Sequence, residues 1–437
     1  METTKNHSSS PDAIVVAASP SEKDHLLPLP VKKRSRRYSI SCVGWIFAAA
    51  SLLIIGNLAL LFLKRESLQE RSRSSSVSMG MDIDRAATTH SNRNSIRPGS
   101  IFLDTNGNPI NAHGGGFLFH NNTYYWYGEI KNGETYLPKE NANWGGTRVD
   151  LTGISCYSSQ DLIQWTYVGN VLPAVYDDPS HDLYYATGIM ERPKVVYNSY
   201  TNKFVMWLHV DAIDYKLARS GVAVSDSPTG PFTYLQSVRP NGQMARDLTV
   251  FVDKKPSPSP PSSSSSTAAA TTNAYLITSS EDNAVMHIHE LSSNYTSFTG
   301  KWERIFENRY MEAPTFFQHN GRYYFIGSGC TAWDPNKARS AVSYNSIWGP
   351  WIEFGNPCKG YDANTTFQSQ STYVLPLLNN DNNDGGVGEG GRPRFMFAAD
   401  RWNAKNLSDS RYVWLPIRFD DEEPVIEWRD EWDFSIL

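Results

Sequence analysis

Four polar side chains recur between residues 191 and 370, each at the head of an apolar run typical of a β-strand. They are Glu191 in MERPKVVY, Asp247 in ARDLTVFV, Glu312 in MEAPTFFQ and Gln370 in SQSTYVLP. Their spacings are 56, 65 and 58 residues, and further strand-like runs follow each of them. Carboxylates that meet in one pocket can supply the acid and the base that cleave a glycosidic bond.

A single acidic residue before a strand is most often a surface turn residue or the partner of an arginine. Three acidic residues in the same register favour a shared site instead. Arg192 and Arg246 directly adjoin Glu191 and Asp247. Because neighbours in a strand point to opposite faces, we do not expect either arginine to neutralise the acid beside it.

Short strands dominate the sequence from residue 98 onward. Runs with period-2 patterning or β-branched and aromatic enrichment are separated by Asn, Asp, Gly and Ser turns. The motifs SDSPTGPFTYL and YNSIWGPWIEFG repeat a Gly-Pro-aromatic unit between a third and a fourth strand. Four strands repeated five times predict an all-β, five-bladed propeller over residues 98–437, and a two-sheet sandwich would not explain the repeat. The first strand of each blade lies nearest the axis, so the four polar residues should converge.

Two segments interrupt this pattern and should be disordered loop insertions. Residues 254–273 are Ser-, Pro- and Ala-rich, and residues 379–391 are rich in Asn, Asp and Gly. We expect neither segment to carry chemistry.

The first 97 residues do not have a globular pattern. Residues 1–41 are polar and end in a basic cluster, which predicts a disordered cytoplasmic tail. Residues 42–63 form an uncharged apolar run of 22 residues, long enough to be a transmembrane helix. The preceding Lys and Arg residues favour a cytoplasmic N-terminus, so the expected topology is single-pass type II. Residues 64–97 are rich in Ser and Arg and would form a flexible stem.

Composition excludes some partners and leaves others open. The net charge is −5 and the chain beyond residue 98 is still more acidic, so no basic footprint for nucleic acid is present. No cysteine spacing resembles a zinc site, and we expect no metal and no cofactor. A Cys330–Cys358 disulfide would span most of one blade, and three free thiols are the alternative. Four glycosylation sequons fit the lumenal side: Asn121, Asn294, Asn364 and Asn406.

Six motifs together resemble glycoside hydrolase family 43, and within it the exo-β-1,3-galactanase subgroup that includes plant Golgi β-1,3-galactosidases. They are AHGGG, YYWYGE, MERPKV, RDLTVFVD, EAPTFF and SQSTYV, and the resemblance covers residues 98–437. It implies a five-bladed propeller that hydrolyses with inversion. Glu312 falls on the family's general acid and Asp247 on the aspartate that tunes the pKa of that acid.

The base position of most family members falls in blade one at residues 111–116, where this chain has no carboxylate. The galactanase subgroup shares that departure, and there a glutamine is thought to hold the attacking water. The resemblance places this role on Gln370, while Gln368 would face the other side of the strand. Glu191 matches a substrate-contacting carboxylate and stays open as an alternative base, because a neutral amide accepts a proton poorly.

Four further residues are candidates for sugar binding. Glu129 and Trp126 in YYWYGE could line the pocket, although Trp126 could equally belong to a blade core. His113 precedes Gly114–Gly116, which would let the backbone approach the axis. Trp333 could be a stacking platform on a loop.

The resemblance implies an exo-β-1,3-galactosidase of the Golgi membrane that acts on β-1,3-galactan chains of arabinogalactan-type glycans. Three alternatives stay open. An arabinofuranosidase or xylosidase would use the same fold, but would be expected to keep a blade-one aspartate. A Golgi glycosyltransferase would show alternating helices. A catalytically inactive, sugar-binding propeller would explain the missing carboxylate.

Overall fold

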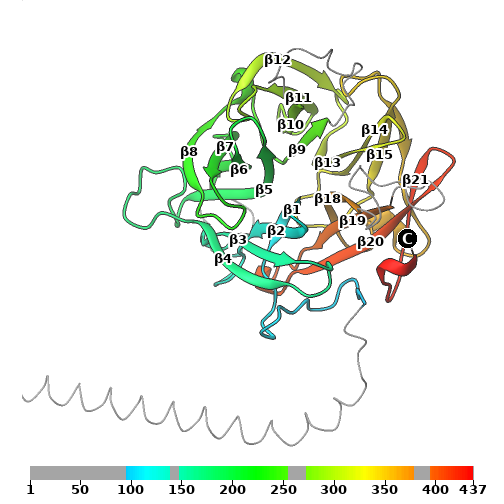
Figure 1. Ribbon diagram of the computed structural model, residues 1–437, viewed down its shortest axis with the longest axis horizontal. Helices are drawn as coiled ribbons and strands as arrows, with labels where there is room; N and C mark the ends of the chain where they lie inside the picture. The colour runs from blue at the N-terminus through cyan, green and yellow to red at the C-terminus, as the bar shows by residue number, and fades with distance from the viewer. Residues whose placement is uncertain (1–94, 138–146, 254–271, 378–393, 437) are drawn as a thin grey trace, which may run out of the picture. The chain divides into compact units, whose positions relative to one another are not determined.

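Five sheets of short strands surround a central axis (Figure 1). The structure is a computed structural model that describes residues 95–137, 147–253, 272–377 and 394–436. These residues belong to one unit, 92–437, and contain 21 strands. The expected all-β, five-bladed propeller is confirmed.

Blades one to three are four-stranded and antiparallel, with the strands in chain order. Blade one contains β1 (His113–His120), β2 (Thr123–Glu129), β3 (Gly153–Ser159) and β4 (Thr166–Pro173). Blade two contains β5 (Gly188–Asn198), β6 (Lys203–Ala212), β7 (Arg219–Ser225) and β8 (Thr233–Val238). Blade three contains β9 (Leu248–Asp253), β10 (Asn273–Ser280), β11 (Val285–Leu291) and β12 (Phe298–Ile305).

Blade five has one strand more than the sequence pattern predicts. Blade four contains β13 (Met311–His319), β14 (Arg322–Gly329), β15 (Arg339–Ser343) and β16 (Ile352–Gly355). Blade five contains β17 (Cys358–Lys359), β18 (Gln370–Leu377), β19 (Arg394–Arg401), β20 (Arg411–Asp420) and β21 (Glu423–Glu427). The extra strand, β17, pairs in parallel with β21 at the outer edge. Two residues are too few for a strand pattern to be visible in the sequence.

Turns between the strands include four short 3-10 helices. They are η1 (Pro240–Gly242), η2 (Ala363–Thr365), η3 (Leu407–Asp409) and η4 (Phe434–Ile436). The described residues contain no helix long and apolar enough to cross a membrane. The predicted span at 42–63, the flanking segments 1–41 and 64–94, and nearly all of the two predicted insertions lie outside the described residues.

Hydrophobic cores fill the spaces between adjacent blades. The second strand of each blade is buried on both faces, as in the pattern of β6, because neighbouring sheets cover it on two sides. The core between blades one and five is aromatic, with Trp126, Trp165 and Trp414 packed on one another. There Ile96 and Trp432 form an antiparallel bridge, with N–H to carbonyl distances of 2.7 and 3.0 Å. This bridge joins the first and the last described segments of the propeller.

The inner strands bulge at the ends that carry the polar residues. Their pairing registers shift between Glu191 and Lys194 in β5 and between Glu312 and Thr315 in β13. Arg192 and Ala313 have positive φ angles of 55° and 53° at these bulges. A bulge inserts an extra residue and re-aims the side chains beside it. Consecutive residues can therefore both face the axis, which regular strand alternation would forbid.

Candidate active site

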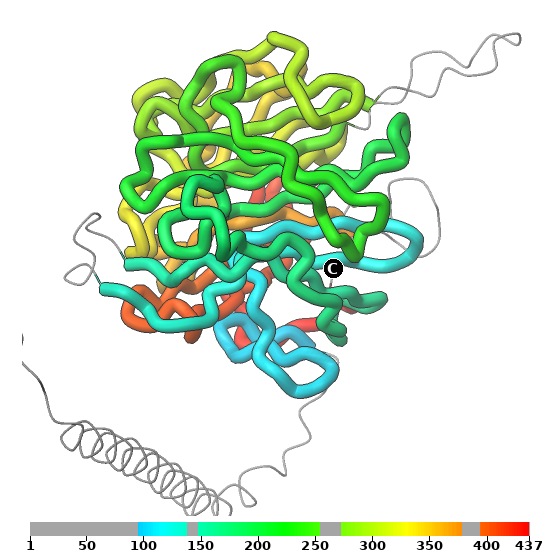
Figure 2. Tube along the Cα trace, turned by 90° about the vertical axis from the view of Figure 1, so that its left-hand side faces the viewer, coloured from blue at the N-terminus to red at the C-terminus, as the bar shows by residue number. Residues whose placement is uncertain are grey.

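A cavity of about 280 Å³ opens at the axis, where the inner strands begin. It draws side chains from all five blades. Figure 2 shows the same sheets from the side, turned by 90° from the view of Figure 1. The lining of the cavity consists of Glu129, Glu191, Arg192, His209, Tyr215, Arg246, Asp247, Asn283, Glu312, Ala332, Trp333, Gln370 and Trp402. The structure thus brings the four predicted polar residues into one pocket.

Glu312, the second residue of β13, has the character of a protonated acid. Burial and the neighbouring negative charge of Asp247 raise the pKa of Glu312 to about 8. Asn283 donates a hydrogen bond of 2.7 Å to Glu312 Oε1. A carboxyl that keeps its proton near neutral pH can donate that proton to a leaving oxygen.

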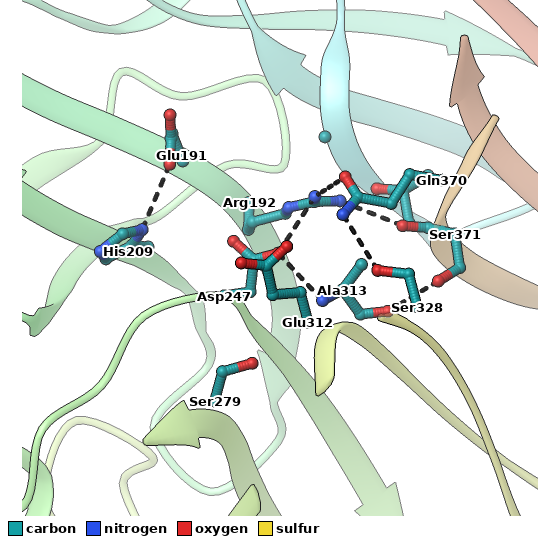
Figure 3. A network of polar contacts seen from close by, with 12 residues as sticks. Glu191, Arg192, His209, Asp247, Ser279, Glu312, Ala313, Ser328, Gln370 and Ser371 are labelled. Atoms are coloured by element: carbon teal, nitrogen blue, oxygen red, sulfur yellow. Dashed lines mark hydrogen bonds and ion pairs between the residues drawn. The ribbon is translucent and has the colours of Figure 1, made fainter. Parts of the chain in front are cut away.

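Arg192 lies at the centre of the polar network that surrounds this acid (Figure 3). Its Nη2 lies 3.1 Å from Asp247 Oδ2 and donates a 2.6 Å hydrogen bond to Gln370 Oε1. The backbone N–H of Ala313 donates to the same oxygen of Asp247 at 2.9 Å. Asp247 therefore keeps a fixed position beside Glu312. As expected, Arg192 does not neutralise its sequence neighbour, but the bulge turns it inward to a carboxylate of the next blade.

The side-chain amide of Gln370 is fixed by three neighbours. Its oxygen accepts from Arg192 and from the indole N–H of Trp402, at 2.6 and 3.2 Å. Its nitrogen donates to Ser328 Oγ at 3.0 Å. Two obligate donors occupy the oxygen, which fits the amide form and leaves one N–H free. In this arrangement Gln370 can orient a water by donating to it, but the amide oxygen has no free lone pair for a proton.

Glu191 is an ionised carboxylate. Burial disfavours its charge, but the hydrogen bond from His209, together with Lys131 and Tyr215, lowers the pKa of Glu191 to about 2. Tyr215 donates a hydrogen bond of 2.9 Å to it, and His209 Nδ1 lies 3.3 Å away. Asp211 lies 3.0 Å from the other ring nitrogen, His209 Nε2. The three groups form a buried acid–imidazole–acid chain on blade two.

Glu129, the last residue of β2, connects blade one to this network. Burial and the charge of Glu191 raise its pKa, against the lowering effect of Lys131. Lys131 Nζ lies 2.6 Å from Glu129 Oε2, and the backbone N–H of Arg192 donates to Oε1 at 2.9 Å. Glu129 lines the pocket as expected.

One group of side chains near the axis has the spacing of a metal site. Ligand atoms of Glu191, His209 and Asp247 all lie within 4.8 Å of one another. Burial disfavours protonation of His209, but the hydrogen bonds and charges of Asp211 and Glu191 raise its pKa to about 9. Both ring nitrogens of His209 already face carboxylates, Nδ1 toward Glu191 and Nε2 toward Asp211. We therefore interpret this group as an ion-pair cluster.

Two tryptophans border the mouth of the pocket. Trp333, on the loop after β14, lines it as the sequence suggests. Its ring meets that of Trp402 edge-on, with centroids 5.1 Å apart. Trp402, which follows β19, was not anticipated. Aromatic faces of this kind can pack against the C–H surface of a sugar.

Two predicted pocket residues prove to be structural. Trp126 is 2% exposed and packs in the aromatic core between blades one and five. Side chains alternate between the two faces of β2, and that of Trp126 lies on the face that packs against blade five. His113 is 1% exposed, lies 3.0 Å from Asp400 Oδ1 and stacks on Tyr412. Neither lines the pocket. The expected close approach at Gly114 is confirmed, since a Cβ there would meet Glu129 Oε1 at 2.1 Å.

The predicted Cys330–Cys358 disulfide is wrong in this structure, where both residues are free cysteines. Cys358 is buried at the edge strand β17 in the core of blade five. Cys330 is exposed as a residue, but partial desolvation of its thiol and the nearby carboxyl of Glu312 raise the pKa of that thiol to about 12. The extra strand carries Cys358 into the next sheet, which the spacing could not reveal.

The predicted glycosylation sites differ in exposure. Asn121, Asn364 and Asn406 are exposed, whereas Asn294 is half-buried and its side-chain oxygen accepts from Ser292 and Thr296. All four stay predictions.

Five residues that line the pocket were not identified from the sequence: His209, Tyr215, Asn283, Ala332 and Trp402. His209 and Asp211 alternate in LHVD, and this buried polar pair inside an apolar strand could have marked them. Trp402 directly follows the strand that pairs with β18, so its position required the pairing register.

Comparison with known proteins connects this geometry to a family. The model of glycosyl hydrolases family 43 matches residues 117–358. The chain belongs to glycoside hydrolase family 43. It is therefore a glycoside hydrolase, and its motifs and structural neighbours place it in the exo-β-1,3-galactanase subgroup. Comparison with curated proteins gives no match.

Three solved structures illustrate the similarity within family 43. A β-1,3-galactosidase, solved with galactodeoxynojirimycin, is 40% identical and covers 78% of this chain and 100% of its own, with a TM-score of 0.64. An exo-β-1,3-galactanase from Phanerochaete chrysosporium, solved as a glutamate-to-glutamine variant with β-1,3-galactotriose, is 30% identical, with coverages of 78% and 68% and a TM-score of 0.64. An exo-β-1,3-galactanase from Clostridium thermocellum is 33% identical, with coverages of 77% and 66% and a TM-score of 0.62.

Proposed function

We propose that the protein is an exo-acting β-1,3-galactosidase that removes terminal galactose from β-1,3-galactan chains of arabinogalactan-type glycans with inversion. The observation that carries this proposal is the half-buried Glu312, whose pKa is raised to about 8 beside Asp247, in the same pocket as the fixed amide of Gln370. The 40% identity to a β-1,3-galactosidase supports the choice of sugar and linkage.

In the proposed reaction Glu312 donates its proton to the glycosidic oxygen as the bond to C1 breaks. A water held by the free N–H of Gln370 attacks C1 from the opposite face, which inverts the configuration. The water becomes strongly acidic only as its oxygen bonds to C1, so a weak base is sufficient to take its proton. Glu191 is ionised in the same pocket and is the carboxylate available for this step.

Galactose release by the full chain tests this proposal. The purified protein should release galactose from β-1,3-galactobiose and β-1,3-galactan, and Glu312→Gln should slow the release by about 10²- to 10⁴-fold. NMR recorded before mutarotation should show the α-anomer first. Initial formation of the β-anomer would refute inversion. Sugar binding without hydrolysis of any β-galactoside would favour the inactive, sugar-binding alternative, and release of arabinose or xylose would favour the other hydrolase.

We also propose that residues 42–63 anchor the enzyme in the Golgi membrane with the propeller in the lumen. The uncharged run of 22 residues and the Lys and Arg residues before it support this topology. In intact Golgi vesicles a tag at residue 437 should resist added protease, and a tag at residue 1 should be removed. Protection of the N-terminal tag instead would reverse the topology.

A further inference from the structure

A second cavity opens on the face of the propeller that carries the active site, at the outer side of blade five. It encloses about 650 Å³ and is lined by Lys359, Gly360, Tyr361, Asp362, Phe367, Arg401, Glu427, Trp428 and Arg429. Strands β17, β19 and β21 all end at it, with last residues Lys359, Arg401 and Glu427. Asp400, next to Arg401, pairs with Gln370 in the first position of β18. The cavity and the catalytic amide therefore share one edge of the fifth sheet.

The cavity contains aromatic surface in two orientations. Tyr361 is 89% exposed, which is unusual for a large aromatic side chain without a partner surface. Trp428 is held in place because its indole N–H donates to Asp430 at 2.7 Å and the Arg401 guanidinium lies 5.4 Å from its ring centroid. Such faces suit the apolar side of a pyranose ring.

Three cations and two carboxylates line the cavity, which leaves it with a small excess of positive charge. Lys359, Arg401 and Arg429 line it, and none forms an ion pair with a carboxylate within the described ranges. Glu427 is already held by Arg418 at 3.2 Å, which leaves Asp362 as the one acid to offset three cations. Arg401 Nε is also buried without a hydrogen-bond partner in the described part of the chain. A planar guanidinium such as those of Arg401 and Arg429 matches the two oxygens of a carboxylate.

A run of left-handed backbone lies between this cavity and the catalytic pocket. Thr366, Phe367 and Gln368 have successive positive φ angles of 51°, 58° and 60°. Arg401 Nη2 holds the segment by donating to the Phe367 carbonyl at 2.8 Å. Non-glycine residues in this conformation are costly and cluster at ligand-binding sites.

We propose that this cavity binds a uronate, a pyranose unit that carries a carboxylate, as an auxiliary site for an acidic branch of the substrate glycan. The aromatic rings take the sugar face, and Arg401 and Arg429 take the carboxylate. The auxiliary role rests on the proposed function, whereas uronate binding itself requires no catalysis. A glycan on Asn364, which is exposed on η2 beside the cavity, has a neutral attachment core and would leave the cations unpaired.

Calorimetry on the full chain tests the site, with Asn364→Gln introduced to remove an attached glycan and galactose added to fill the catalytic pocket. Methyl β-D-glucuronide should bind, and Arg429→Ala and Tyr361→Ala should each weaken it about tenfold or more. Lys203→Ala removes a cation at the start of β6, on the opposite face, and should have no effect. Equal affinity for neutral methyl β-D-glucoside, equal binding of acetate, or no effect of either cavity variant would overturn the proposal.

Hydrolysis assays distinguish a failure of the uronate site from a failure of the proposed galactosidase activity. Arg429→Ala and Tyr361→Ala should cleave neutral β-1,3-galactobiose at the parental rate but lose affinity for a uronate-bearing galactan. Uronide binding without any galactose release would refute the proposed function and leave the site intact. Galactose release without uronide binding would refute the site alone.

Discussion

The guanidinium of Arg192 lies 3.1 Å from the carboxylate of Asp247, and the two residues come from the inner strands of different blades. This ion pair fixes a negative charge beside Glu312, and that charge contributes to the raised pKa of the acid. The same guanidinium donates to Gln370. One side chain thus holds both Asp247, which lies beside Glu312, and the amide of Gln370.

Replacing the acid should remove protonation of the leaving group. For Glu312→Gln we expect kcat on β-1,3-galactobiose to fall between about 10² and 10⁴-fold with little change in KM. An aryl β-galactoside with an acidic phenol should be affected far less, because its leaving group needs no proton. Steady-state kinetics on both substrates check this, with the exposed-strand variant Glu353→Gln as a control. An equal loss on the two substrates would argue against an acid role.

Removing the negative neighbour should move the alkaline limit of activity. The protonated form of Glu312 is active, so kcat/KM should fall as pH rises through about 8. In Asp247→Asn, that charge no longer opposes ionisation of Glu312, so the pKa of Glu312 falls. The alkaline limit of activity should then shift to lower pH by about one unit. Asp226→Asn, at an exposed acid, should leave the profile unchanged. A shift to higher pH would contradict the proposed coupling.

The amide at position 370 should matter for holding water rather than for accepting a proton. Gln370→Met removes both hydrogen-bonding groups at similar size, and we expect a loss of about 10²-fold or more in kcat. Gln370→Glu keeps an acceptor for Arg192 and can hold the water by accepting a hydrogen bond from it, so it should retain much of the activity. Wild-type activity in Glu191→Gln would exclude Glu191 as the base.

The buried chain on blade two should support stability in a pH-dependent way. Asp211 pairs with His209 and accepts backbone N–H bonds from Ala212, Leu217 and Ala218. Asp211→Asn leaves a buried imidazolium without this partner, so we expect a loss of about 3–5 kcal/mol in the free energy of unfolding.

The pH dependence of this loss follows from the pKa of His209, about 9 in the folded protein against an ordinary value of 6.5. Protonation of His209 stabilises the fold fully below 6.5, and this contribution is lost as pH rises through about 9. The difference in Tm between parent and variant should therefore be larger at about pH 6 than at about pH 9.5. A difference that does not change with pH would mean that only the backbone hydrogen bonds of Asp211 count.

Chemical labelling tests whether Cys330 and Cys358 are free thiols. Alkylation in denaturant without reduction should label both Cys330 and Cys358, because neither is in a disulfide. In the native protein Cys358 should resist labelling, since it is buried. Peptide mass spectrometry distinguishes labelled from bridged residues. A Cys330–Cys358 peptide pair would restore the original prediction.

The blades were predictable because their information is local. Alternating patterns and Gly-Pro-aromatic turns repeat along the chain, and the register of Glu191, Asp247, Glu312 and Gln370 placed all four at the axis. The bulges at Arg192 and Ala313 were not visible, since a bulge depends on the partner strand as well as on the bulged one. Trp126 was misassigned because an aromatic residue suits a sugar face and a core equally well.

Other features could not be predicted from the sequence, because they depend on contacts between distant parts of the chain. His209 is protonated because its two ring nitrogens lie beside two carboxylates, Asp211 on the same strand β6 and Glu191 on the neighbouring strand β5. The two-residue strand β17 has no pattern of its own, yet it decides where Cys358 lies. Sequence spacing alone cannot supply these relationships.

The bridge between Ile96 and Trp432 has a consequence for biosynthesis. The two residues are separated by almost the whole propeller, so the ring cannot close until the ribosome has delivered the last blade. Blades two to four can mature while synthesis continues, but the tryptophan-rich seam between blades one and five must wait. During that interval an unfinished ring exposes its largest aromatic surface, which makes late translation the stage at which chaperone assistance matters most.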